Sequence, residues 1–224
     1  MGDAAVENAR RGYYGSVSFV DEQIGRILET LDRKGLLKRT LVIYLSDHGD
    51  MLGDQYLWRK SYAYQGSARI PMMVHWPEGM PAANRAIDNP VEIRDVLPTL
   101  LDAAGASVPR GVDGASLLKL AKNSAGWRPW IDLEHDVCYA PENHWNALTD
   151  GRRKYIFHAM TGEEQFFDLE NDPHELKNLA GDAEVAVWRE RLIAHLAVRG
   201  EPWVVNGRLG VRPRSQLYSP NYPK

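Results

Sequence analysis

The segment LVIYLSDHGDMLGDQYLWRK, residues 41–60, contains side chains that are suited to binding a metal ion. Asp47 and His48 offer one oxygen and one nitrogen ligand to a divalent cation. Gly49 lets the backbone turn away from such an ion without a side chain in its path. Lys60 follows His48 by twelve residues, and the residue types alone leave open whether it belongs to the same site. The segment predicts either part of a divalent-cation site or an ordinary turn with a capping aspartate and a surface histidine.

The apolar run before Asp47 is expected to be a strand that is buried on both faces. TLVIYL, residues 40–45, is short, continuous and rich in branched residues. A predicted amphipathic helix over residues 10–34 precedes it, and Gly35 ends that helix. This order is typical of α/β folds with a parallel sheet, whose ligands bind beyond the carboxyl ends of the strands. Asp47 and His48 are predicted to lie at such an end.

Two further elements complete the predicted α/β part, residues 1–125. PMMVH, residues 71–75, is expected to be a second buried strand. Residues 93–104 predict a helix that Gly105 stops, and Pro98 within it predicts a kink or a later start. We therefore expect a partial parallel sheet with helices around it.

The sequence changes character after residue 125. Four short strand-like pieces between residues 130 and 169 are separated by turn sequences, and Asp150-Gly151 is a hairpin signal. An amphipathic helix follows over residues 183–199. Residues 126–200 therefore predict an antiparallel sheet with one helix, and residues 201–224, rich in Pro, Gly and Arg, predict an extended tail.

The composition excludes several classes of protein. The chain has 224 residues, 44% of them hydrophobic, and a net charge of -3, so no basic excess indicates nucleic acid binding. No apolar run approaches the roughly 20 residues that a membrane span needs. The first residues lack the apolar core of a signal peptide, which favours a cytoplasmic location. A single cysteine, Cys138, rules out an internal disulfide and reveals nothing of the compartment.

Several spaced motifs together resemble the sulfatase family of the alkaline-phosphatase-like superfamily. They are YYGSVSFVDEQIGRILETL, TLVIYLSDHG, GDQYLWRK, YQGSARIPMMV and GVDGASLL, followed by ALTDGRRKYIF and FFDLENDPHELKNLA. The motifs occur in the family's order and extend to about residue 200. They match the C-terminal half of a sulfatase.

The resemblance implies roles for particular residues. Asp47 and His48 match two ligands of a divalent cation, with calcium expected and manganese or zinc as alternatives because histidine suits those metals. Lys60 matches the lysine that contacts the sulfate and the bridging oxygen. Arg59, Trp58, Tyr62 and His144 are further candidates for substrate binding. Ordinary packing or solvation is the alternative for each of these four.

The family's nucleophile has no counterpart in the sequence. Sulfatases use a formylglycine that is made from Cys or Ser in a Cys/Ser-x-Pro-x-Arg motif, and this motif is absent. Cys138 lies in CYAPEN, where the proline is one place late and no arginine follows. The early pair of metal-binding aspartates is also missing. The chain is therefore expected to need a missing N-terminal half, or to self-associate through apolar surface that this half would cover.

Three functions remain open on the sequence. The first is part of a hydrolase that cleaves a small-molecule or carbohydrate sulfate ester. The second is a phosphonate or phosphate diester hydrolase of the same superfamily, which His48 favours. The third is a catalytically incomplete domain without enzymatic activity of its own.

Overall fold

The computed structural model describes residues 2–80, 85–136 and 143–213, and these form two compact units. The first unit comprises residues 1–58 and 70–127, and the second comprises residues 59–69 and 128–224. The sequence-based division differs at one segment, because Arg59–Arg69 belongs to the second unit. Cys138 lies outside the described residues.

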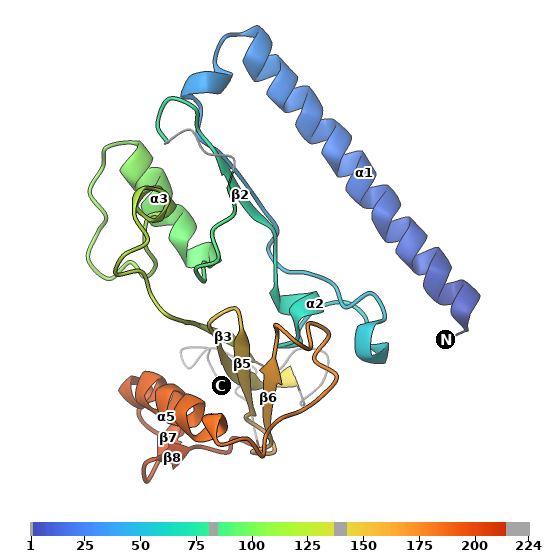
Figure 1. The fold of residues 1–224 in the computed structure, drawn as a ribbon, viewed down its shortest axis with the longest axis vertical. Coiled ribbons are helices and arrows are strands. Elements are labelled where there is room, and N and C mark those ends of the chain that lie inside the picture. The colour runs from blue at the N-terminus through green and yellow to red at the C-terminus, as the bar shows by residue number, and fades with distance from the viewer. Residues whose placement is uncertain (1, 81–84, 137–142, 214–224) are drawn as a thin grey trace, which may run out of the picture. The chain divides into compact units, whose positions relative to one another are not determined.

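The first unit begins with a helix that is longer than the pattern predicts. Helix α1 spans Asp3–Arg33, and none of its residues is buried. The remaining elements of this unit are β1 (Val42–Leu45), β2 (Met72–His75), α3 (Val96–Ala103) and α4 (Leu117–Lys122). Figure 1 shows α1 in blue and α3 in green.

The parallel sheet expected in this unit is not found among the described residues, and this prediction was wrong for β1 and β2. The two strands pair antiparallel, with Val42 opposite His75 and Leu45 opposite Met72. Parallel neighbours need a crossover, usually an α-helix that packs on the sheet. The connection from β1 to β2 contains only a 3₁₀ turn and the four-residue α2 (Gln65–Ala68), which is too short for that role. The strands are half-exposed instead of buried, since each has one neighbour.

Pro98 marks a late helix start, one of the two outcomes that its position predicts. A 3₁₀ turn over Ile93–Asp95 precedes α3, so Pro98 falls in the first turn of the helix, where its missing N–H breaks no helical hydrogen bond. The fully buried Asp95 accepts hydrogen bonds from the backbone N–H groups of Glu92 and Ala115, at 2.9 and 2.7 Å. Gly114 has a φ of 91°, and a Cβ there would lie 2.3 Å from the Arg94 carbonyl oxygen. The GVDGASLL motif therefore serves to join α3 to α4.

The second unit is the predicted antiparallel meander. Its strands are β3 (Ile131–His135), β4 (Trp145–Thr149), β5 (Arg153–His158) and β6 (Glu164–Asp168), in sequence order within the sheet. Helix α5 (Glu184–Leu196) packs on one face through residues such as Trp188 and Leu192. The strands β7 (Val204–Val205) and β8 (Arg208–Leu209) form a hairpin within the predicted extended tail, beside α5 in Figure 1. Residues 214–224 lie outside the described part.

The second face of the meander is covered by the segment Arg59–Arg69. Ala63 and Tyr64 pack with Trp145, Ile156 and Phe167 in an apolar cluster. Because both faces are covered, every residue of β4 is buried. The sheet therefore fixes the segment that carries Lys60.

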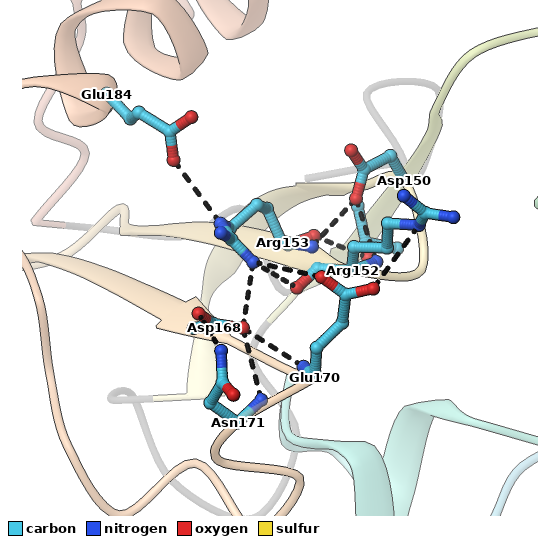
Figure 2. A network of polar contacts seen from close by, with 8 residues as sticks. Asp150, Arg152, Arg153, Asp168, Glu170, Asn171 and Glu184 are labelled. Atoms are coloured by element: carbon cyan, nitrogen blue, oxygen red, sulfur yellow. Dashed lines mark hydrogen bonds and ion pairs between the residues drawn. The ribbon is translucent and has the colours of Figure 1, made fainter.

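The Asp150-Gly151 hairpin between β4 and β5 forms as predicted. Asp150 Oδ1 accepts hydrogen bonds from the backbone N–H groups of Arg152 and Arg153, and Gly151 takes a φ of 89°. Figure 2 shows the Arg153 guanidinium between Asp168 and Glu184, at 2.8 and 3.3 Å. The turn is thereby tied to β6 and to the start of α5.

Glu164 is predicted to make the stability of the second unit depend on pH. The Arg189 guanidinium holds both Glu164 oxygens, at 2.5 and 2.6 Å, and lowers the pKa of that carboxyl. A lowered carboxyl pKa contributes stability that is present above the unfolded-state pKa, about 4.3, and is lost as the pH falls through the folded-state value. The urea concentration at the unfolding midpoint is expected to fall as the pH drops below ~4.3. We expect this fall to be smaller in the Glu164→Gln variant.

The exposed neighbour Glu163 provides the control for this measurement. Glu163→Gln is expected to leave the acid limb of the midpoint curve as steep as in the unsubstituted chain. Equal acid limbs in the Glu164→Gln variant and the unsubstituted chain would show that the Arg189 pair does not govern acid stability.

Candidate functional site

Asp47 and His48 lie together in the turn that follows β1. The His48 backbone N–H donates to Asp47 Oδ1 at 3.0 Å, and the Ser46 hydroxyl donates to the His48 carbonyl oxygen at 2.6 Å. These bonds replace the strand ladder once β1 ends. The Asp47 side chain remains 83% exposed, so its carboxylate is open to a ligand.

The Nε2 nitrogen of the His48 ring is directed at Asp47. Nδ1 lies 2.8 Å from the Gly49 carbonyl oxygen, which only accepts, so Nδ1 carries the proton of the neutral ring. Nε2 then bears a lone pair and lies 3.5 Å from Asp47 Oδ2. Two acceptors facing each other are suited to holding a cation between them. Ligand atoms about 2.3–2.6 Å from a calcium ion and at right angles to each other are separated by about 3.5 Å, so the spacing fits.

These two residues are not a complete metal centre. Across the part of the chain that the structure describes, no group of three or more His, Cys, Asp or Glu side chains is placed to hold a metal ion. Calcium takes six to eight oxygen ligands as a rule. Asp47 and His48 therefore fit two positions of a larger ligand set.

The loop after His48 has an unusual concentration of strained backbone. Leu52, Gln55, Tyr56, Arg59 and Ser61 are non-glycine residues with positive φ. Such conformations cost energy and persist where the surroundings enforce them, often at functional sites. In the first unit, the Arg10 guanidinium donates to the Leu52 carbonyl oxygen at 2.8 Å, which ties α1 to this loop.

Lys60 belongs to the second unit, and its neighbours in the chain are anchored there. Arg59 and Ser61 have φ values of 68° and 87° on either side of it. The Trp145 indole N–H donates to the Ser61 carbonyl oxygen at 2.9 Å. Lys60 is half-buried, and Arg59 is exposed.

The other predicted substrate residues have different surroundings. Trp58, in the first unit, lies over Gly53, where a Cβ would be 3.3 Å from the indole ring. Tyr62 is half-buried in the second unit, and its backbone N–H donates to the Ser67 hydroxyl at 3.3 Å. The substrate-binding role predicted for these two residues and for Arg59 stays a prediction.

His144 is buried in a polar cluster of the second unit. Its Nε2 lies 3.4 Å from the Arg212 guanidinium, which also donates to Asn146 Oδ1 at 2.5 Å. Burial, followed by the charge of Arg212, lowers the pKa of His144 below its usual value. Burial likewise lowers the pKa of Arg212, to about 10. At neutral pH the cluster therefore holds a neutral imidazole beside a charged guanidinium, and the predicted substrate contact of His144 stays a prediction.

Sequence reasoning missed Lys154 and Glu175. They form a fully buried ion pair of 2.8 Å in the second unit, in contact with the segment that carries Lys60. One signal was present in the sequence: Lys154 directly precedes the apolar run YIF. A charge on a buried strand face requires a partner.

Comparisons with known proteins match this chain to one family. The sulfatase family model matches residues 2–106. The arylsulfatase of Clostridium perfringens is 38% identical over 212 residues, which cover 92% of this chain and 44% of that protein. The chain thus spans less than half the length of this relative.

Solved structures extend the similarity to the fold. The protein BT4656, in complex with its substrate D-glucosamine-2-N,6-O-disulfate, matches with a TM-score of 0.73 and 28% identity, over 89% of this chain and 42% of that one. The phosphonate monoester hydrolase of Agrobacterium radiobacter matches with a TM-score of 0.73 and 28% identity, over 88% and 42%. None of the helices in the described ranges has the length and apolarity that crossing a bilayer requires.

Proposed function

Because this chain belongs to the sulfatase family, we propose that it supplies part of the active site for hydrolysis of a sulfate ester. The observation that carries the proposal is the pair of Asp47 Oδ2 and His48 Nε2, 3.5 Å apart in the turn after β1. Sulfatases generally use a divalent metal, and these two atoms are a carboxylate and an imidazole ligand in suitable positions.

Three residues share two tasks in the proposed reaction. Asp47 and His48 hold the cation, with calcium as the expected metal. When bound, the cation polarises the non-bridging sulfate oxygens and orients the ester. Lys60 lies beside the bridging oxygen and stabilises the negative charge that develops there as the bond to sulfur breaks. The chain contains no Cys/Ser-x-Pro-x-Arg motif, so a further segment provides the formylglycine nucleophile.

The substrate class is proposed from the relatives. The substrate of BT4656 is a sulfated glucosamine, and another relative is an N-acetylglucosamine-6-O-sulfatase of Bacteroides thetaiotaomicron. A sulfated carbohydrate is therefore the substrate we propose for the complete site. The rival function is phosphonate ester hydrolysis, which the similarity to the Agrobacterium radiobacter enzyme and the histidine at position 48 favour.

A complementation assay tests this function. The chain is co-expressed with the part of the Clostridium perfringens arylsulfatase that it does not match, and the purified assembly is called the reconstituted enzyme. We expect hydrolysis of 4-nitrophenyl sulfate by the reconstituted enzyme in calcium and none by either part alone. We also expect kcat/KM for this sulfate to exceed that for phenyl phosphonate monoester. A preference for the phosphonate would establish the rival function, and activity of the chain alone would refute the need for a second segment.

Exposed apolar side chains on α1 support the need for a further segment. Phe19 and Ile27 are 64% and 60% exposed on this helix. Large apolar side chains gathered on one element favour association. We propose that the complementary segment covers them, and the reconstituted enzyme is then expected to elute as one copy of each part. Self-association of the chain alone is the alternative that the same column run detects.

A further inference from the structure

Lys154 is a charged residue in the middle of an apolar sheet face. Its side chain is 0% exposed, and it belongs to β5 beside Ile156. A lone ammonium in such a place is costly unless every donor has a partner. All three donors have one: Glu175 Oε1 at 2.8 Å, the Ala63 carbonyl oxygen at 2.8 Å and Gln65 Oε1 at 3.0 Å. Two of these acceptors belong to the segment Arg59–Arg69.

The second carboxylate oxygen of Glu175 also contacts the segment Arg59–Arg69. Its side chain is 1% exposed, and Oε2 accepts the backbone N–H of Gln65 at 2.6 Å. The residue has a φ of 56°, in the left-handed region that non-glycine residues rarely adopt. Strain of this kind persists where the surroundings enforce it.

We propose that Lys154 and Glu175 are positioning residues for Lys60, because their buried pair fixes the segment Arg59–Arg69 on the meander sheet. The inference rests on the role proposed above for Lys60. It adds that the position of Lys60 is set by the meander sheet β3–β6, which follows much later in the sequence, and not by the loop that contains Lys60. A small displacement of a charge that stabilises a transition state slows the reaction, so a rigidly held segment favours catalysis.

The type of contact supports positioning more than general stabilisation. The acceptors on the segment are a backbone carbonyl and a side-chain amide, and the donor to Glu175 is a backbone N–H. Such hydrogen bonds are directional, whereas an apolar contact allows the segment to slide. With the Trp145 bond to Ser61, they determine the backbone on the C-terminal side of Lys60.

The test uses hydrogen exchange of the 224-residue chain. Lys154→Met alone removes the ammonium that faces the buried Glu175 carboxylate, so the double variant Lys154→Met/Glu175→Gln is the main one. We expect the backbone amides of Gln65 and Ser67 to exchange about tenfold faster or more in this variant, while the β4–β5 ladder keeps its protection. Lys177→Met, at an exposed lysine of the same unit, is the matched control and is expected to change neither.

A second readout reports on Lys60 itself. In the double variant we expect acetylation of Lys60 by acetic anhydride, relative to Lys177 in the same molecule, to be about threefold faster as the segment opens locally. Unchanged exchange at Gln65 and Ser67 would overturn the proposal. Equal loss of protection in the β4–β5 ladder, or loss of the fold, would also overturn it, because the pair would then support the core in general.

The outcomes separate this inference from the proposed function. If Lys60→Ala leaves the reconstituted enzyme fully active while the segment loosens as expected, the role of Lys60 fails and the pair is only an anchor. If Lys60→Ala abolishes turnover and the double variant leaves the segment rigid, the function stands and the positioning role fails.

Discussion

Replacing Lys60 by alanine is expected to lower kcat of the reconstituted enzyme for 4-nitrophenyl sulfate by about 10²–10³-fold. The physical reason is the charge that builds on the bridging oxygen as the ester bond breaks. A fixed ammonium interacts with that charge more strongly in the transition state than in the bound ester, so the loss falls on kcat more than on KM. Steady-state kinetics at saturating calcium measures both constants.

Lys177→Ala is the control for this experiment, since it removes an exposed lysine from the same unit. Its kcat is expected to equal that of the unsubstituted protein. A Lys60→Ala enzyme with unchanged kcat and raised KM would contradict the assignment, because Lys60 would then bind the ester without stabilising its cleavage.

Removing the Asp47 carboxylate is expected to weaken metal binding by at least about 10–100-fold, the range that supporting residues of metal sites already reach. In the Asp47→Ala variant the His48 Nε2 lone pair loses the carboxylate oxygen that lies 3.5 Å away. Activity should return when the calcium concentration is raised, since the other ligands remain. The measurement is the calcium concentration that gives half-maximal turnover after dialysis against a chelator.

Asp32→Ala supplies the comparison for the metal experiment, because Asp32 is an exposed carboxylate on α1 in the same unit. Its calcium dependence is expected to match that of the unsubstituted protein. Identical calcium curves for Asp47→Ala and the unsubstituted protein would remove Asp47 from the ligand set.

Local patterns account for the elements that the sequence predicts well. The period of apolar residues in α1 and the short strand-like stretches of β4 and β5 depend on neighbouring residues alone. The Asp150-Gly151 turn has a chemistry of its own that selects a hairpin. Antiparallel strands joined by short turns then pair in sequence order, which explains why the meander was predictable.

Long-range placement accounts for what the sequence did not predict. The direction of β2 relative to β1 depends on a connection that leaves the first unit and returns to it. Arg59–Arg69 has no pattern that assigns it to the meander, because it is anchored by hydrogen bonds with the distant residues Trp145, Lys154 and Glu175. Contacts between residues so far apart in sequence leave no local period.

The candidate site shows the same contrast. Asp47 and His48 are adjacent in sequence, so the sequence predicts that they lie close together. The structure adds that the His48 Nε2 atom faces the Asp47 carboxylate. Lys154 was overlooked because its role depends on hydrogen bonds to the segment Arg59–Arg69, which covers its strand. A lysine beside an apolar run of a strand is a local signal that a buried polar contact is needed, but the sequence does not identify the partner.

The dependence of kcat on the leaving group tests the central claim most directly. A series of aryl and alkyl sulfates with increasing leaving-group pKa is hydrolysed by the reconstituted enzyme and by its Lys60→Ala variant. We predict a shallow decline for the unsubstituted enzyme and a steep one for the variant, since poorer leaving groups place more charge on the oxygen that Lys60 stabilises. Parallel declines for the two enzymes would contradict the account, because Lys60 would then have no part in stabilising the departing oxygen.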